Sequence, residues 1–308
     1  MIKSYEDFKS YNFINSIEIP KIIIKTGSFV KSDLPIDIVN LYNDIIEKNP
    51  AYTLFYFDDN DRFNFIKDNY DERYVDAYFK LIPKAYQADL FRYLILYKFG
   101  GVYMDFSMSP LLNIDDIILD YKEVYVRDMI PKNMYNAFIA TIKNTEILKS
   151  CINKCLYNIE NENYGDHVLC VTSPAILGET FLDSNIDGVS EGSSIKIGKI
   201  NEGLLIYDFK EGDEKHIISP FDNQNIIRTK IDNHYTIIYG EKLNKLHYSS
   251  LWYAKLVFKN ERYFQIENIY EEIYGGKIES NYATELFSSD KNIEEIKNII
   301  YENKQAIY

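Results

Sequence analysis

The chain has 308 residues but little cysteine, with three residues of this type at Cys151, Cys155 and Cys170. So few cysteines do not make a disulfide framework. Cys151 and Cys155 lie four positions apart on a predicted helix, and no histidine or cysteine follows closely at the spacing of a zinc site. We therefore expect ordinary thiols and an intracellular, cytoplasmic location in which thiols stay reduced.

Long apolar runs are missing as well. Residues 1–7 contain no apolar signal core, and no stretch reaches the roughly 18–20 apolar residues that a membrane-spanning helix needs. The sequence therefore predicts a chain without a transmembrane anchor.

Basic residues are outnumbered by acidic ones. The chain has 34 Lys and Arg, only six of them Arg, against 47 Asp and Glu, so its formal net charge is −13. This charge argues against binding to nucleic acid through phosphates and against docking on anionic lipid. An anionic nucleotide would need local compensation from a metal ion or a few basic side chains.

Several enzyme motifs are also absent. The sequence has no phosphate-binding P-loop, no G-x-G-x-x-G turn, no G-x-S-x-G elbow and no Cys–His constellation. No two carboxylates stand out as the opposed pair, roughly 5–10 Å apart, that a glycoside hydrolase needs.

What the chain does contain is an alternation of short apolar runs and segments of helical spacing. The predicted elements are a strand within 19–27, a helix over 35–49, a strand over 52–57, a helical stretch over 61–80, a helix ending at Phe99 and a strand after Gly101. This order predicts an α/β fold with a largely parallel central sheet. Ligands bind at the carboxyl ends of such strands, where Thr26, Asp58 and Asp105 are expected to converge.

The run from Gln87 to Ser107 is the most informative part of the chain. It predicts a helix, a glycine stop at Gly100, a short buried strand and an acidic strand end at Asp105. Asp89 and Arg92 share one face of the helix. Alone they would be a surface pair worth a few tenths of a kcal/mol, but they lie among apolar residues in a chain poor in arginine. Such a set of groups can hold a sugar nucleotide and its metal ion.

This run fits the pattern A-x-x-A/S-D-x-x-R-x-x-x-L-x-x-x-G-G-x-Y-x-D-x-D of a known family. The matching residues are Ala85, Ala88, Asp89, Arg92, Leu96, Gly100, Gly101, Tyr103 and Asp105. The chain thus resembles the DXD-motif sugar transferases that include the yeast initiating α-1,6-mannosyltransferase and capsular polysaccharide enzymes. The clostridial glucosylating toxins are more distantly similar. The resemblance covers residues 19–115 well and the rest only in fragments.

The resemblance implies a GT-A-type nucleotide-sugar-binding domain with helical additions. It implies a hexosyltransferase that retains the anomeric configuration and moves a sugar from a UDP- or GDP-sugar to a glycan, polysaccharide or protein acceptor. Asp89 and Arg92 would orient the sugar, and Asp105 would bind the ribose, the diphosphate and Mn²⁺ or Mg²⁺. Lys25, Thr26 and Tyr103 would line the nucleotide pocket.

The same resemblance suggests how the rest of the chain is organised. We expect a single domain over 1–308, made of a peripheral arm at 1–18, a nucleotide-sugar-binding core at 19–115, an acceptor-side half at 116–260 and a helical extension at 261–308. Within the second half, strands are predicted at 124–126, 136–140 and 234–239, helices at 146–159 and 290–303, and hairpins and loops over 184–233.

The chain also departs from the family pattern. Ser107 occupies the second acidic position, and a neutral hydroxyl is a poorer metal ligand than a carboxylate. Asp105, Ser107 and His247 could hold the metal together with phosphate and water, or Asp115 or Asp116 could fold back to replace the missing acid. Metal binding could also be lost. The alternative function is accordingly a non-catalytic sugar-nucleotide-binding or scaffold subunit.

Two further departures concern the ends of the resemblance. Ile24 replaces the usual histidine of the opening strand, and no tryptophan follows it. Late in the chain, His247 and Trp252 resemble an H-x-x-x-S-W segment with altered spacing. Trp252, the only tryptophan, is expected either in the donor site or in the core.

Overall fold

A computed structural model describes residues 1–13, 17–210, 216–230, 248–253, 255–274, 294–295 and 297–298. Over these residues, no helix is both long and apolar enough to cross a membrane. The predicted strand at 234–239, His247 and most of the predicted helix at 290–303 lie outside the described residues.

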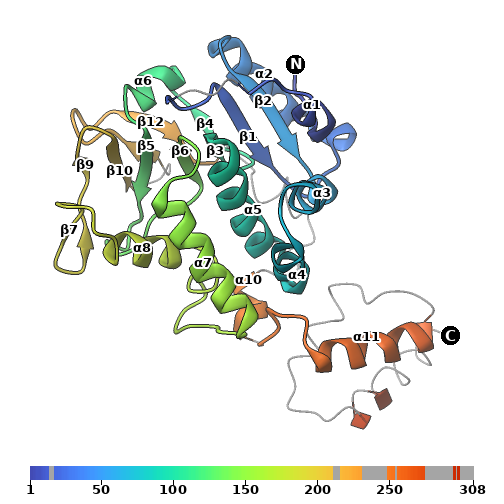
Figure 1. The fold of residues 1–308 in the computed structure, drawn as a ribbon. Coiled ribbons are helices and arrows are strands. Elements are labelled where there is room, and N and C mark those ends of the chain that lie inside the picture. The colour runs from blue at the N-terminus through green and yellow to red at the C-terminus, as the bar shows by residue number, and fades with distance from the viewer. Residues whose placement is uncertain are drawn as a thin grey trace.

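A central sheet organises the fold (Figure 1). Its first part is parallel, with β1 (Ile22–Thr26) between β2 (Thr53–Phe57) and β3 (Gly101–Met104). Next come β6 (Phe138–Thr141), β5 (Glu123–Arg127) and β10 (Leu204–Lys210). Since β6 is antiparallel to both β3 and β5, and β10 is parallel to β5, strands β2, β1, β3, β5 and β10 all point the same way. The predicted α/β class with a largely parallel central sheet is confirmed.

Short strands complete the sheet beyond β10. These are β11 (His216–Ile218), β12 (Asn225–Arg228), β4 (Ser109–Pro110) and β9 (Gly198–Lys199), all in antiparallel pairs, while β7 (Ser190–Glu191) and β8 (Ser194–Ile195) form a separate hairpin. The prediction of hairpins and loops over 184–233 was therefore wrong for β10, a buried seven-residue strand of the main sheet. Its pairing with β5 joins segments about 80 positions apart, which local sequence pattern does not reveal.

Helices cover both faces of the sheet, because successive side chains of a strand point to opposite faces. Ile22 and Ile24 of β1 lie in one apolar core, and Ile23 lies in the other. The first core faces α1 (Tyr5–Lys9), α3 (Asp59–Asn69), α4 (Glu72–Lys80), α5 (Lys84–Phe99), α7 (Glu146–Glu160) and α8 (Pro174–Leu182). The second faces α2 (Ile36–Lys48) and α6 (Ile114–Ile118).

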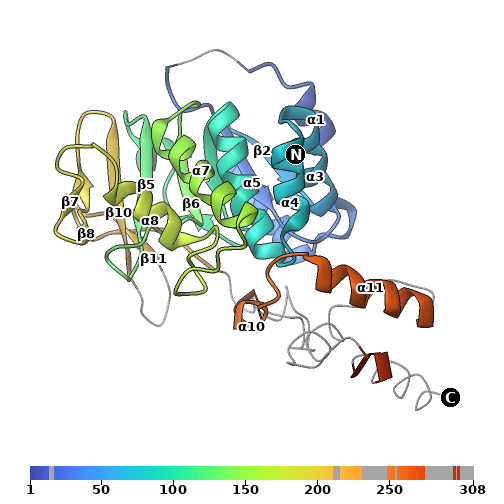
Figure 2. The same cartoon turned by 60° about the horizontal axis from the view of Figure 1, so that its bottom comes forward.

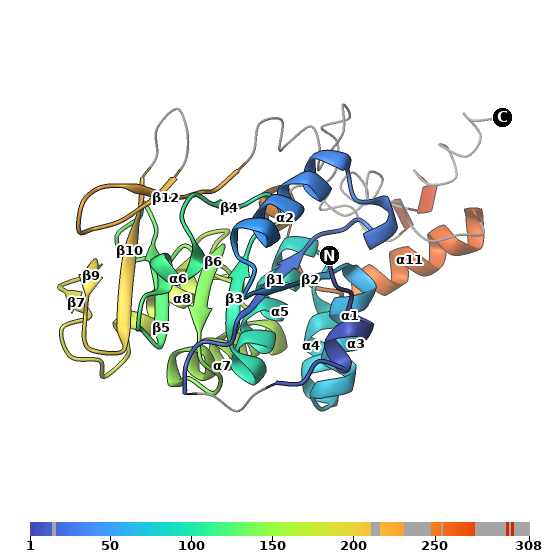
Figure 3. The ribbon, with the colours of Figure 1, turned by 90° about the horizontal axis from the view of Figure 1, so that it is seen from above.

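The figures show this layering directly. Figure 2 shows α3, α4, α5 and α7 side by side in one helical layer, and Figure 3 shows α2 on the other side of the sheet. A 3₁₀ turn (Lys31–Asp33) precedes α2, and α10 (Tyr248–Tyr253) and α11 (Glu261–Tyr274) follow the sheet, with α11 leading away from the helical layer in Figure 2. The predicted division at 18, 115 and 260 stays a prediction.

The start of the chain packs against the sheet. Tyr5 and Phe8 of α1 are buried, and the Lys3 amide donates to the Leu54 carbonyl at 2.9 Å. The predicted arm therefore contributes to the core beside β2.

The predicted helical stretch over 61–80 is two helices. The first ends at Asn69, and Asp71 begins the second by accepting a hydrogen bond from the Arg73 amide at 3.1 Å. An aspartate that caps the next helix is a recognisable break signal.

Candidate active site

A pair of glycines sets the geometry of the site by joining α5 tightly to β3. Gly100 and Gly101 have φ angles of 71° and 111°, which favour glycine. A Cβ at Gly101 would lie 2.5 Å from Cγ1 of Ile22, so only glycine lets β3 start this close to β1. The tight reversal brings the beginning of α5, with Asp89, to the carboxyl end of β3, with Asp105.

Arg92 links the two acidic residues. Its Nη1 donates to Oδ1 of Asp105 at 3.0 Å and to the Asn136 carbonyl at 2.7 Å, and its Nη2 lies 3.0 Å from Oδ1 of Asp89. The guanidinium lies 4.5 Å from the centre of the Tyr103 ring. Burial opposes its charge, but Asp105, Tyr103 and Asp89 outweigh that effect and raise the pKa of Arg92. Asp89 and Arg92 are thus a buried pair rather than a surface pair.

Asp89 is bonded at both carboxylate oxygens. Asn136 Nδ2 donates to Oδ1 at 3.0 Å, and the hydroxyls of Thr172 and Ser173 donate to Oδ2. Burial raises the pKa of Asp89, with Arg92 and Ser173 acting in the opposite direction. Asp89 therefore ties α5 to the start of α8 and to the segment before β6. The sequence analysis predicted a strand over 136–140 but assigned no role to Asn136, Thr172 or Ser173.

Asp105 has a different environment. Its side chain is 44% exposed, whereas that of Asp89 is 8% exposed. Arg92 and the Tyr103 hydroxyl both donate to Oδ1 at 3.0 Å, and the described hydrogen bonds of this carboxylate all fall on that oxygen. Two donors thus orient the carboxylate while Oδ2 is left available for a ligand.

Lys25 lies beneath the turn that follows β3. The side chain is fully buried, and its Nζ donates to the carbonyls of Asp105 at 2.9 Å and Met108 at 2.6 Å. Burial lowers the pKa of Lys25 to about 7, and the Asp105 charge acts against this change. Ser107, inside the same turn, is 2% exposed. In this structure Lys25 supports the turn instead of lining an open pocket.

Thr26 ends β1 at the same edge of the sheet. Its hydroxyl donates to the Phe57 carbonyl at 2.8 Å and accepts from Nη1 of Arg62 at 2.6 Å. The buried Arg62 also donates to Tyr78 and to Asp59. The sequence analysis did not single out Arg62, although arginine is rare in this chain and its position could have been noted for that reason.

Asp58 and Asp115 have local roles. Asp58 caps α3 by accepting from the amides of Asn60 and Asp61. Asp115 accepts from Lys21 at 2.8 Å and Tyr52 at 2.6 Å, residues that precede β1 and β2. It therefore lies at the amino ends of these strands, opposite Asp105, where it does not replace the missing acid of the D-x-S run.

Trp252 packs near the start of α5. Its Nε1 donates to the Tyr164 carbonyl at 2.9 Å, and the Tyr248 ring of the same helix lies 5.6 Å from the Tyr86 ring of α5. No described hydrogen bond or ring contact joins Trp252 to Asp89, Arg92 or Asp105. The structure thus brings together Asp89, Arg92, Tyr103, Asp105 and, through the turn, Lys25, but not Trp252.

The described residues offer a limited metal site. Among them, no group of three or more His, Cys, Asp or Glu side chains could hold a metal ion. Asp105 supplies one exposed carboxylate, and Mg²⁺ commonly uses one or two carboxylates together with substrate phosphates. The residues fit a metal that binds jointly with a diphosphate.

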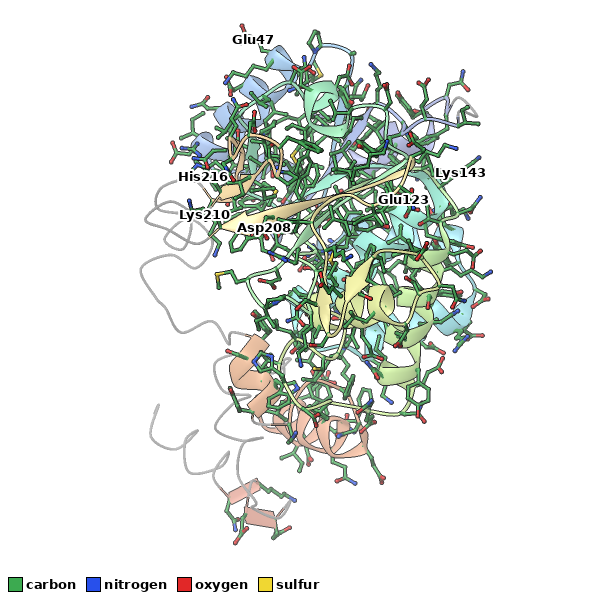
Figure 4. All side chains as sticks on the ribbon, turned by 90° about the vertical axis from the view of Figure 1, so that its left-hand side faces the viewer. Glu47, Glu123, Lys143, Asp208, Lys210 and His216 are labelled. Carbon is green, nitrogen blue, oxygen red and sulfur yellow. The ribbon has the colours of Figure 1, made fainter. Side chains whose placement is uncertain are left out.

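A separate cleft of about 670 Å³ lies at the opposite edge of the sheet. It is lined by residues at the amino ends of β5 and β10, including Glu123 and Leu204, and by none of the predicted site residues. Figure 4 shows Glu123 toward one end of the sheet and Asp208 and Lys210 toward the other, the carboxyl end of β10. The cleft and the charged network of Asp89, Arg92 and Asp105 thus lie at opposite edges of the sheet. We take the network as the candidate site because it contains the predicted site residues.

Part of the candidate site lies in a segment that is similar to a known family. Residues 35–124 match the family described as the glycosyltransferase sugar-binding region containing DXD motif. The matched segment contains Asp89, Arg92, Tyr103 and Asp105. The predicted resemblance to the DXD sugar transferases is confirmed over this segment.

Two named relatives are similar to part of this chain. An uncharacterized glycosyltransferase, L373, of Acanthamoeba polyphaga mimivirus is 31% identical over 101 residues, 32% of this chain and 40% of the relative. Inositol phosphoceramide mannosyltransferase 2 of Schizosaccharomyces pombe is 30% identical over 125 residues, 40% of this chain and 34% of the relative. The chain therefore spans well under half the length of these relatives. The solved structure of PaToxG glycosyltransferase aligns with 57% of this chain and over 73% of its own chain, with 18% identity and a TM-score of 0.44.

Proposed function

We propose that this protein is a glycosyltransferase that moves a hexose from a UDP- or GDP-sugar to a hydroxyl of a glycan, polysaccharide or protein acceptor. The observation that carries the proposal is the position of Arg92, which joins a buried and an exposed carboxylate at the carboxyl edge of the sheet. Nucleotide ligands of open α/β sheets bind at that edge. The relatives' names, glycosyltransferase and mannosyltransferase, support the same reaction class.

Asp105 is the proposed ligand-binding carboxylate. Arg92 and Tyr103 hold Oδ1, so Oδ2 can face the ribose, the diphosphate and Mn²⁺ or Mg²⁺. A bound divalent ion would stabilise negative charge on the departing nucleoside diphosphate. Retention of the anomeric configuration is proposed from the family resemblance.

Asp89 and Arg92 are proposed to place the donor sugar. Because both oxygens of Asp89 already accept hydrogen bonds, its first task is to hold Arg92 and Asn136 in place. A sugar hydroxyl that reaches Asp89 would have to share an oxygen with Thr172 or Ser173.

A donor screen tests the function. Purified protein is incubated with UDP- and GDP-sugars and Mn²⁺, and release of the nucleoside diphosphate is measured. We expect one donor to be hydrolysed, with the rate lost in Asp105→Asn. The matched control is Asp116→Asn, which removes an exposed carboxylate from α6, outside the network. Equal rates in Asp105→Asn and wild-type protein would refute the assignment.

The alternative, a non-catalytic sugar-nucleotide-binding subunit, is favoured by one observation. Ser107 leaves the turn with one acidic side chain, and that serine is buried. Binding of a nucleotide sugar without hydrolysis or transfer to any of a panel of glycan acceptors would support this alternative.

A further inference from the structure

Lys25 is an unusual residue for the middle of a sheet. It belongs to β1, and its side chain, which ends in an amino group, is fully buried. In the described part of the chain, no carboxylate forms an ion pair with it. Its partners are the carbonyls of Asp105 and Met108, and its Nζ lies 5.4 Å from the centre of the Tyr42 ring.

Anchoring the turn does not by itself require a charge. The backbone already closes the turn, since the Met108 amide donates to the Asp105 carbonyl at 3.0 Å, and the Tyr42 hydroxyl donates to the Phe106 carbonyl at 2.9 Å. Burial of a charge without an opposite charge is costly. The carbonyls solvate the ammonium but leave its net charge, which therefore acts on whatever binds at the turn.

The turn above Lys25 is the place where the sequence lacks an acid. With Ser107 in the second acidic position, Asp105 supplies the only carboxylate of the D-x-S run. The turn therefore has one negative charge fewer than a two-acid motif and one buried positive charge directly below it. The missing carboxylate and the buried lysine both make the turn more favourable for an anion and less favourable for a cation.

We propose that the Lys25 ammonium supplies positive charge to the donor's diphosphate through the turn at residues 105–108. The lysine thereby takes over part of the charge compensation that a tightly held metal ion provides in a two-acid motif. This inference rests on the proposed function, since it assumes that a nucleoside diphosphate binds at Asp105. It makes Lys25 a positioning residue that never touches the reacting atoms, and it implies that nucleoside diphosphate binding persists without metal.

Calorimetry with UDP and GDP tests the proposal at pH 6.0, once in EDTA and once in Mn²⁺. We expect wild-type protein to bind one of them in EDTA. Lys25→Met, which keeps an unbranched side chain one atom shorter and removes the charge, should weaken this affinity by at least about tenfold. The loss should be smaller for the nucleoside monophosphate, which carries less charge.

Lys21→Met is the matched control. It removes a lysine just before the same strand, but Lys21 is half exposed and pairs with Asp115 at the opposite edge. Its affinity for the nucleotide should equal that of wild-type protein. The melting temperature of Lys25→Met is measured as well, because the substitution removes a buried charge but also leaves the Met108 carbonyl without its Lys25 donor. If Lys25→Met does not fold, Lys25→Gln keeps two N–H donors without the charge and should show the same affinity loss.

The outcomes separate the two proposals. A wild-type protein that binds neither nucleotide even with Mn²⁺ contradicts the proposed function. Wild-type binding that requires Mn²⁺ absolutely, or equal affinity of Lys25→Met and wild-type protein in EDTA, overturns the role of Lys25 and leaves the proposed function intact.

Discussion

The two carboxylates on either side of Arg92 are in contrasting environments. Asp89, on α5, is buried and accepts hydrogen bonds at both oxygens from two other segments of the chain, besides its pair with Arg92. Asp105, at the end of β3, is nearly half exposed and is bonded at one oxygen. One arginine thus joins a carboxylate already used for packing to one available for a ligand.

The different environments of Asp89 and Asp105 indicate different roles for the two carboxylates. A buried carboxylate with a full set of partners contributes to the stability and position of the network, so its replacement should be seen mainly in unfolding. An exposed carboxylate oriented by two donors contributes little to stability, so its replacement should be seen mainly in ligand binding.

The largest effect is expected when Arg92 is replaced. Arg92→Met leaves Asp89 buried without its cation and should lower the free energy of unfolding by about 3–5 kcal/mol. Urea unfolding followed by circular dichroism measures the loss. The pKa of Asp89 is already raised above its ordinary value of 3.8. The folded variant would hold that proton more tightly than the unfolded chain, so the destabilisation should grow as pH rises above about 4.

Arg92→Lys serves as the control for that prediction. It keeps a positive charge but lacks the planar guanidinium with which Arg92 contacts Asp89, Asp105 and the Asn136 carbonyl at the same time. We expect a smaller loss of stability and a clear loss of donor turnover. A lysine variant with full activity would contradict the bridging role of Arg92.

Asp89→Asn should have the next largest effect. The amide keeps the shape of the side chain but loses the charge-assisted bond to Arg92, and it offers one acceptor oxygen where the carboxylate has two. The expected loss is about 1.5–3 kcal/mol in free energy of unfolding. If thermal melting were unchanged while nucleotide affinity fell, Asp89 would be a direct ligand and the contrast with Asp105 would be wrong.

The smallest effect is expected for Ser107→Asp. A second carboxylate in the turn should lower the Mn²⁺ concentration for half-maximal donor hydrolysis by about threefold to tenfold, because ligand charge tunes the affinity of hard cations. The gain should be larger in a Lys25→Met background, since the buried ammonium no longer attracts the new carboxylate. Weaker donor binding at every Mn²⁺ concentration would instead indicate a site that works without metal.

Local sequence patterns predicted the central residues of this site but not the residues that hydrogen-bond to Asp89. The run from Gln87 to Ser107 combined helical spacing, a glycine stop and a strand, so Asp89, Arg92 and Asp105 could be placed at one edge. Asn136, Thr172 and Ser173 come from segments about 45–85 positions further on, and no local periodicity links them to Asp89.

The same limit applied to the fold. The apolar runs of β1 and β2 and the amphipathic spacing of α2 were sufficient to predict these elements within a few residues. β10 was missed because it lies within a polar, glycine-dotted region and owes its place to pairing with β5. The burial of Lys25 was also missed, since a lysine at a strand end normally predicts an exposed side chain.

The role of Asp105 is tested most directly by measuring nucleotide affinity and thermal stability together in Asp105→Asn. Calorimetry with UDP and GDP in Mn²⁺ gives the affinity, and differential scanning fluorimetry gives the melting temperature, with Asp116→Asn as the control. We expect Asp105→Asn to lose Mn²⁺-dependent nucleotide binding while its melting temperature stays within a few degrees of the wild-type value. Wild-type affinity in a folded Asp105→Asn protein would contradict the assignment of the exposed carboxylate as the donor ligand.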